Sequence, residues 1–348
     1  MSGTARAGRQ SCRPTLIDGD RCLGVKGSWV RSCRRAGGVA WHEHGVWHIQ
    51  PVDSSSSERV TTPVLHVGYE FAGEPDAPPV ILLHGFPYDV RAFDDVVPIL
   101  VAKGAFVLAP YLRGFGPTSF RDRTTKRSGQ QAALGQDLIE FMNEMKINRA
   151  ILAGYDWGGR AACIVAALHP ERVHGLVTVS GYNIQNISSA LEPIAPELER
   201  TYWYQYYFHS ERGRRGLYRH RDELCELLWR TWSPTWSRAS NAFAASVPSL
   251  HNPDFVDVVI HSYRHRYGLV DGDPRYQSVE DLLASQPPIS VPSVVLESGA
   301  DGVGGPVASD DREHFTGPYK HRLLPGVGHN VPQEAPEAFA EAVTTLLP

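Results

Sequence analysis

The sequence has no apolar run of the 18 or so residues that a membrane span requires, so we expect no membrane anchor. It also lacks an excess of one charge: the formal net charge is -4, which argues against a nucleic-acid or other polyanionic partner. Cysteine is scarce, with five residues and no C-x-x-C spacing, and this favours a reducing, cytoplasmic setting. What remains, 348 residues of which 42% are hydrophobic, is typical of an ordinary soluble enzyme with a full-sized core.

The first 58 residues differ in composition from the rest of the chain. Arginines are scattered there among glycine, serine and cysteine, and four consecutive serines at 54–57 close the segment. We expect residues 1–58 to form a disordered basic extension because they lack apolar periodicity. The segment also holds four potential metal ligands, His42, Glu43, His44 and His48. No second ligand cluster of matching spacing accompanies them, so we expect no metal site.

A strand-to-helix turn is predicted at residues 150–168. The apolar run 150–153 leads into Gly-Tyr-Asp-Trp-Gly-Gly, and small residues at helical spacing follow. Glycines flank the tip of such a turn because its backbone is strained and neighbouring chains crowd it. The residue at the tip is Asp156. A carboxylate there can attack electrophilic carbon directly, and it needs no base for that step because it is already ionised near pH 7.

Three further polar motifs each follow a predicted strand. His84-Gly85-Phe86-Pro87 ends the apolar run 80–83, Asp301 comes after a strand that begins at residue 293, and His329 comes after a strand at 322–324. Strand and helix patterns alternate between residues 80 and 179. This alternation predicts a mostly parallel sheet covered by helices on both faces.

These four motifs, in this order, resemble the α/β-hydrolase superfamily, and within it the branch of epoxide hydrolases and haloalkane dehalogenases. The resemblance runs from about residue 64 to residue 347. It implies an α/β-hydrolase core at 59–182 and 269–348, with a helical cap inserted at 183–268. It also implies a nucleophile, Asp156, an acid, Asp301, and a histidine, His329, with Asp310 and Asp311 as fallback acids.

The resemblance implies further site residues. The backbone N–H groups of Phe86 and Trp157 would form an oxyanion hole. In the predicted cap, Tyr204 and Tyr263 match the two tyrosine motifs of epoxide hydrolases, with Tyr267 a rival for the second. Substrate contacts are assigned to three aromatic residues, His84, Trp203 and Tyr207.

The function implied first is the opening of an epoxide to a diol through an aspartyl ester. The partners would be a small-molecule substrate and water, with no metal or organic cofactor. A haloalkane or haloacetate dehalogenase would use the same nucleophile and stays open as an alternative. A fluoroacetate dehalogenase would have arginine at Trp157 and a His-Trp pair at Tyr204-Gln205, so this chain departs from that pattern. A non-catalytic small-molecule receptor on the same fold is a third alternative, although an intact Asp156, Asp301 and His329 set argues against it.

Overall fold

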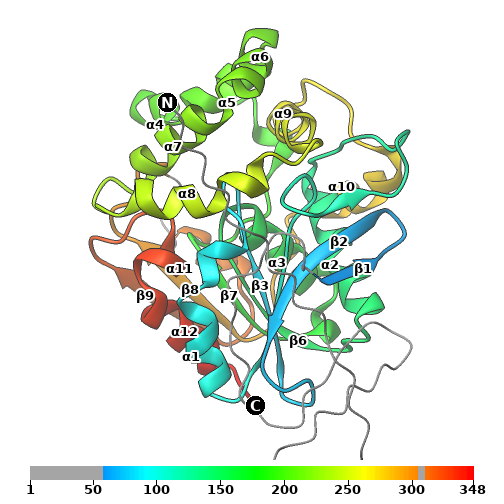
Figure 1. The fold of residues 1–348 in the computed structure, drawn as a ribbon, viewed down its shortest axis with the longest axis vertical. Coiled ribbons are helices and arrows are strands. Elements are labelled where there is room, and N and C mark those ends of the chain that lie inside the picture. Colours follow the sequence, from blue (N-terminus) through cyan, green and yellow to red (C-terminus); the bar gives the residue numbers. More distant parts are fainter. Residues whose placement is uncertain (1–57, 305–309) are drawn as a thin grey trace, which may run out of the picture. The chain divides into compact units, whose positions relative to one another are not determined.

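The structure is a computed structural model, described here for residues 58–304 and 310–348 (Figure 1). The predicted basic extension lies outside these residues except for Glu58, and so do the four potential metal ligands within it.

The described strands form a single sheet in the order β1-β2-β4-β3-β6-β7-β8-β9, with β5 paired to β2. The strands β1, β2 and β5 run antiparallel to their partners, and the pairs from β4 to β9 are parallel. Their bounds are β1 Glu58–Thr61, β2 Leu65–Ala72, β3 Pro79–Leu83, β4 Phe106–Pro110, β5 Ser119–Phe120, β6 Ala150–Gly154, β7 Val173–Val179, β8 Ser293–Ser298 and β9 Tyr319–Leu324. The predicted parallel sheet is confirmed. Its central strands are buried along almost their whole length, because helices cover both faces.

Two pairs of helices cover the sheet. α1 packs against α12, and α2 packs against α3. The crossover through α1 moves along the sheet in the opposite direction to the crossover through α3, so right-handed connections place the two helices on opposite faces. The helices described are α1 Val96–Ala102, α2 Gln131–Glu144, α3 Asp156–Leu168, α4 Pro196–Thr201, α5 Trp203–His209, α6 Glu211–Arg219, α7 Arg221–Trp232, α8 Ala239–Leu250, α9 Phe255–His265, α10 Gln277–Leu283, α11 Val331–Glu334 and α12 Pro336–Thr344. None of them is long and apolar enough to cross a membrane.

Strand register brings the predicted motifs to one edge of the sheet. Leu83 at the end of β3 pairs with Gly154 at the end of β6, so the two loops that follow them start side by side. Ser298 at the end of β8 pairs with Leu324 at the end of β9 in the same way. Because parallel strands point in one direction, all four loops emerge at the carboxyl end of the sheet.

The chain between β7 and β8 is helical: it contains helices α4 to α10 and short 3₁₀ turns. The first six of these helices, α4 to α9, form the helical insertion. Figure 1 shows α4 to α9 beyond one end of the strands, with the sheet below them in that view. In this insertion α5 packs against α6 and α9, and α7 packs against α8. Helices α4 to α9 lie within the range predicted for the cap, 183–268, whose existence as a separate domain and role as a lid stay predictions.

A buried ion pair fixes the loop after β4. The guanidinium of Arg113 donates two hydrogen bonds of 2.6 Å to the carboxylate of Asp137 in α2. It also donates to the backbone oxygen of Ser128 at 2.7 Å and to the hydroxyl of Tyr276 at 3.1 Å. Arg113 is fully buried, so this bidentate geometry compensates for the lost hydration of both charges.

Candidate active site

The turn between β6 and α3 has the strained geometry that the sequence predicts. Asp156 has a φ of 50°, in the left-handed region that a non-glycine residue seldom adopts. The neighbouring chain leaves no room for a side chain at the flanking glycines: a Cβ on Gly158 would lie 2.1 Å from the backbone oxygen of Leu83, and one on Gly154 would lie 2.6 Å from the backbone of Gly158. The glycines therefore allow the close approach, and the turn holds the Asp156 side chain above the end of the sheet.

One backbone N–H donates to the Asp156 carboxylate, and that of the next residue has no acceptor within its helix. Phe86 donates its N–H to Asp156 Oδ1 at 2.7 Å. Trp157 lies in the first turn of α3, where a backbone N–H has no acceptor within the helix. Burial alone raises the pKa of Asp156, but the neighbouring His329, the charge of Arg160 and the Phe86 N–H together lower it below its ordinary value. The carboxylate is thus held in its ionised form.

His329 lies between two carboxylates. Its Nδ1 is 2.9 Å from Asp301 Oδ2, a hydrogen bond, and its Nε2 is 3.7 Å from Asp156 Oδ2, which is too far for one. Asp301 is itself held by the backbone N–H of Val303 at 2.8 Å. The Nε2 of His329 is buried without a hydrogen-bond partner among the described residues, so it remains available to a water molecule or substrate.

The two carboxylates decide the protonation of His329. Burial lowers its pKa, but the charges of Asp301 and Asp156 and the hydrogen bond to Asp301 outweigh burial and raise the pKa to about 10. At neutral pH the imidazole of the free protein is therefore protonated. It can act as a base only after it gives up this proton.

The two predicted cap tyrosines pack against each other, and Tyr204 but not Tyr263 is among the residues that line the cavity with Asp156. Tyr204 on α5 and Tyr263 on α9 have ring centroids 5.4 Å apart, and Tyr263 also packs against the ring of Trp157 at 6.1 Å. Burial raises the pKa of both phenols, so both stay protonated. The rival Tyr267 instead donates its hydroxyl to Gln205 Oε1 at 3.3 Å.

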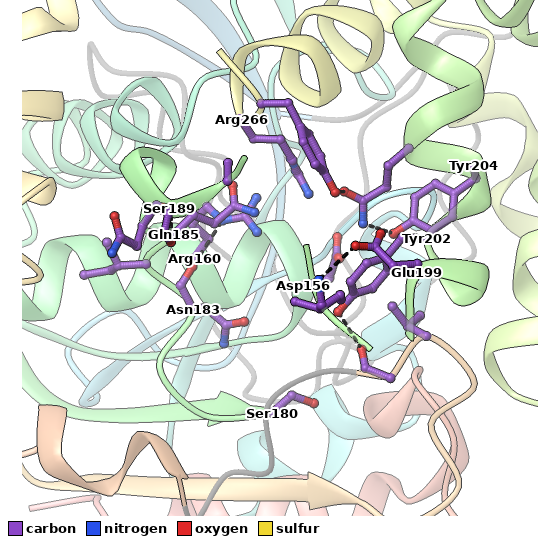
Figure 2. A pocket seen from close by; sticks show the side chains of 18 of the residues that line it. Asp156, Arg160, Ser180, Asn183, Gln185, Ser189, Glu199, Tyr202, Tyr204 and Arg266 are labelled. Carbon is purple, nitrogen blue, oxygen red and sulfur yellow. Dashed lines mark hydrogen bonds between the residues drawn. The ribbon is translucent and has the colours of Figure 1, made fainter. Parts of the chain in front are cut away.

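A cavity of about 920 Å³ opens beside Asp156 (Figure 2). Its lining includes Asp156, Asp301, His329 and Tyr204. The described lining does not include three predicted substrate contacts, His84, Trp203 and Tyr207.

Those three aromatic residues have other contacts. His84 is buried, with Nδ1 3.0 Å from the Gly85 oxygen and Nε2 accepting the Leu112 N–H at 3.0 Å. Trp203 is 39% exposed on the outer side of α5. The hydroxyl of Tyr207 lies against Gly216 in α6, where an added Cβ would be 1.9 Å away. The structure therefore gives their predicted substrate contacts no support, because each side chain is directed elsewhere.

Sequence reasoning missed most polar residues of the cavity wall, among them Arg160, Gln205 and Arg266. Arg160 is one helical turn after Asp156 and interrupts an otherwise small and apolar helix, a signal that the sequence does contain. Gln205 donates its amide to the Tyr204 hydroxyl oxygen at 3.1 Å. That phenol therefore accepts one hydrogen bond and keeps its own proton to donate. Nothing in the local sequence distinguishes Arg266 from the other arginines of the insertion.

The structure describes the side chain of only one of the two fallback acids. Asp311 accepts the backbone N–H of Tyr182 at 2.9 Å, and the side chain of Asp310 lies outside the described part of the structure. Among residues 58–304 and 310–348, no group of three or more histidine, cysteine or acidic side chains could hold a metal ion.

Comparisons with known proteins identify the family to which the chain belongs. The model of the alpha/beta hydrolase fold family matches residues 78–336, so the chain belongs to that family. Its relatives place it in the branch of epoxide hydrolases and haloalkane dehalogenases, as the motifs predict, and it is an enzyme.

Three of these relatives illustrate the similarity. Epoxide hydrolase A of Mycobacterium tuberculosis is 26% identical over 79% of this chain and 92% of its own length. A crystal structure of a Klebsiella pneumoniae protein, provisionally named an epoxide hydrolase, is 42% identical with a TM-score of 0.82, covering 85% of this chain and 99% of that one. Haloalkane dehalogenase of Mycobacterium marinum is 34% identical over 35% of this chain and 40% of its own length.

Proposed function

We propose that this enzyme hydrolyses an epoxide to a diol through a covalent ester on Asp156. The observation that carries the proposal is the pair of buried phenols, Tyr204 and Tyr263, beside an ionised carboxylate. An epoxide opens readily only when a donor protonates its leaving oxygen, and these phenols are held in their protonated form. The relatives named epoxide hydrolases support the same substrate class.

In the first step, a carboxylate oxygen of Asp156 forms a bond to an epoxide carbon, and the bond between that carbon and the ring oxygen breaks. The ring oxygen takes a proton from Tyr204 or Tyr263 and becomes a hydroxyl group. The product is a hydroxyalkyl ester on Asp156, with one tyrosine left as phenolate. The helical insertion at 183–268 supplies both phenols, so we assign it the role of a lid over the site.

In the second step, the proton of His329 first passes through water to the phenolate that the first step leaves, which restores the tyrosine and makes the imidazole neutral. Water then attacks the ester carbonyl carbon and gives its proton to Nε2 of His329. The N–H groups of Phe86 and Trp157 stabilise the oxyanion that forms on Asp156. Collapse of this intermediate releases the diol and regenerates the carboxylate. Asp301 holds the imidazole in place through its 2.9 Å hydrogen bond.

A dehalogenase is the second candidate because of one observation. The indole Nε1 of Trp157 is buried and has no hydrogen-bond partner among the described residues. An indole N–H can only donate, and a departing halide requires such a donor. With a halide as the leaving group, neither phenol would have to transfer a proton.

The test compares Tyr204→Phe, Tyr263→Phe and their double variant with Trp157→Phe, each on an epoxide and on a haloalkane. The measurement is the rate of ester formation before steady state. For an epoxide we expect each tyrosine variant to be slowed about 10- to 100-fold, the double variant to be nearly inactive, and Trp157→Phe to be less affected. Unimpaired ester formation from the epoxide in the double tyrosine variant would refute the proposal. Loss confined to Trp157→Phe with the haloalkane would favour the dehalogenase.

A further inference from the structure

Two buried arginines line the cavity next to Asp156. Arg160 on α3 and Arg266 at the end of α9 are each only 8% exposed. In Figure 2 the guanidinium groups of both point into the space beside Asp156, Arg160 from the helix that begins at Asp156 and Arg266 from the insertion. Neither forms a salt bridge within the described part of the chain, whereas buried Arg113 is fully paired. These two charges therefore differ from the structural arginine of the core.

Few of their hydrogen-bond donors are used. Arg160 donates Nε to the backbone oxygen of Asn183 at 3.1 Å, and Arg266 donates Nη2 to the Ser262 hydroxyl at 3.3 Å. The Nε of Arg266 is buried and has no acceptor among the described residues. A guanidinium has five N–H donors, and leaving a buried charge unpaired is costly. Arg266 Nε thus has no acceptor in the described part of the chain, and a ligand in the cavity could supply one.

The groups around the pair do not provide that acceptor. The guanidinium of Arg266 lies 4.2 Å from the ring centroid of Tyr263. This cation–π contact uses the face of the guanidinium group and none of its N–H donors. Burial and then the positive charge of Arg266 lower the pKa of Arg160 to about 10, although Asp156 raises it.

Three other glutamates line the cavity, Glu192, Glu199 and Glu297, and the last two have partners among the described residues. Glu199 accepts the Ile194 N–H at 3.0 Å and also the hydroxyl of Tyr206. Glu297 lies 2.6 Å from Nε2 of His321. Neither is within salt-bridge distance of the two arginines.

We propose that Arg160 and Arg266 bind an anionic group of the substrate, so that the substrate class is an epoxide that carries a carboxylate. This inference rests on the proposed function. A planar carboxylate matches the guanidinium fork, and it would satisfy donors that the protein leaves unpaired. Arg160 is four residues after Asp156, about 6 Å along the helix axis, so the anionic group lies within a few bonds of the attacked carbon. Short epoxy acids fit this spacing.

The first test compares glycidate with glycidamide, which share one epoxide ring and differ in charge. For the full-length enzyme we expect kcat/KM to be about 10- to 100-fold higher for glycidate, the range that hydrogen bonds to a charged group supply. Arg160→Gln and Arg266→Gln should each reduce this ratio, and the double variant should bring it close to one. Arg212→Gln, at an exposed arginine of α6, is the matched control and should keep the wild-type ratio. A wild-type ratio of one or less, or a ratio that neither arginine variant changes, would overturn the inference.

A binding measurement separates this inference from the proposed function. Calorimetry on Asp156→Asn, which lacks the nucleophile, should detect glycidate binding that is at least 10-fold tighter than glycidamide binding, and Arg266→Lys in that background should weaken the preference. If the arginines only support the ring of Tyr263, the two ligands will bind alike, and the inference fails even though epoxides are opened. If glycidate binds through the arginines but only chloroacetate is turned over by the wild type, the anion site stands and the proposed function fails.

Discussion

Replacing His329 with glutamine should separate the two proposed steps. The ester-forming step requires only the Asp156 carboxylate and a phenol, so Asp156 should still be alkylated. The second step requires a base for water, and glutamine cannot accept that proton. We expect ester hydrolysis to slow by about 10²- to 10⁴-fold, the usual contribution of a general base, and the ester to accumulate.

The structure also sets the pH at which the second step operates. At the 3.7 Å between His329 Nε2 and Asp156 Oδ2, an opposite charge contributes about 4 kcal/mol in a partly buried site, which corresponds to about three pKa units. Ester formation neutralises Asp156 and removes this contribution. The pKa of His329 should then fall from about 10 to about 7. Alkylation of the carboxylate would thus convert a protonated histidine into a usable base at neutral pH.

Rapid-mixing kinetics and mass spectrometry of the peptide that contains Asp156 can follow both steps. In the wild type, the rate of ester hydrolysis should rise with pH and level off above about 7. Below its pKa in the ester form, the His329 imidazole is protonated and cannot act as a base. Alkylation should stay nearly constant between about pH 6 and 9, where the carboxylate of Asp156 is ionised. Asp156→Asn is the control, since it should form no adduct. Normal ester hydrolysis by His329→Gln would refute the reasoning. So would a wild-type rate of ester hydrolysis that keeps rising until about pH 10.

Two further predictions concern stability. Arg113→Met should destabilise the fold by about 3–5 kcal/mol because it leaves the Asp137 carboxylate buried and unpaired, and an Arg113→Met, Asp137→Leu double variant should recover most of the loss in denaturant unfolding. Recovery would be absent if the pair were not the cause. Gly158→Ala should abolish folding or lower Tm far more than Gly159→Ala, because a Cβ at 158 would lie 2.1 Å from the backbone oxygen of Leu83, whereas at 159 it meets a side-chain amide at 3.0 Å. Equal Tm values for the two variants would contradict this.

The sequence predicts those parts of the site that are set by local rules. Asp156, Asp301 and His329 each follow a strand, and parallel strands must deliver their following loops to one edge of the sheet. Their proximity therefore follows from alternating patterns and glycine positions. The turn at Asp156 is predicted as well, because only glycine fits beside it at 154 and 158.

The cavity wall above these residues cannot be predicted in the same way. Arg160 and Arg266 are more than 100 residues apart in sequence, and they meet only because the insertion packs over α3. Helical periodicity does not reveal which of Trp203, Tyr204 and Tyr207 faces inward, since all lie on one short helix rich in aromatic residues. The pairing of α5 with α9 decides this, and that pairing is tertiary.

The charge of the site links the two proposals. Around the nucleophile, protonated His329 and the two arginines carry three positive charges against the two carboxylates of Asp156 and Asp301, and a carboxylate on the substrate would balance the third. In the first step Asp156 loses its charge, and the phenol that protonates the ring oxygen gains one, so the balance holds. Transfer of the His329 proton to that phenolate, through water, leaves the total unchanged and produces the neutral base that the second step requires. Because the phenolate takes this proton inside the site, His329 becomes a base without a change in the net charge around it.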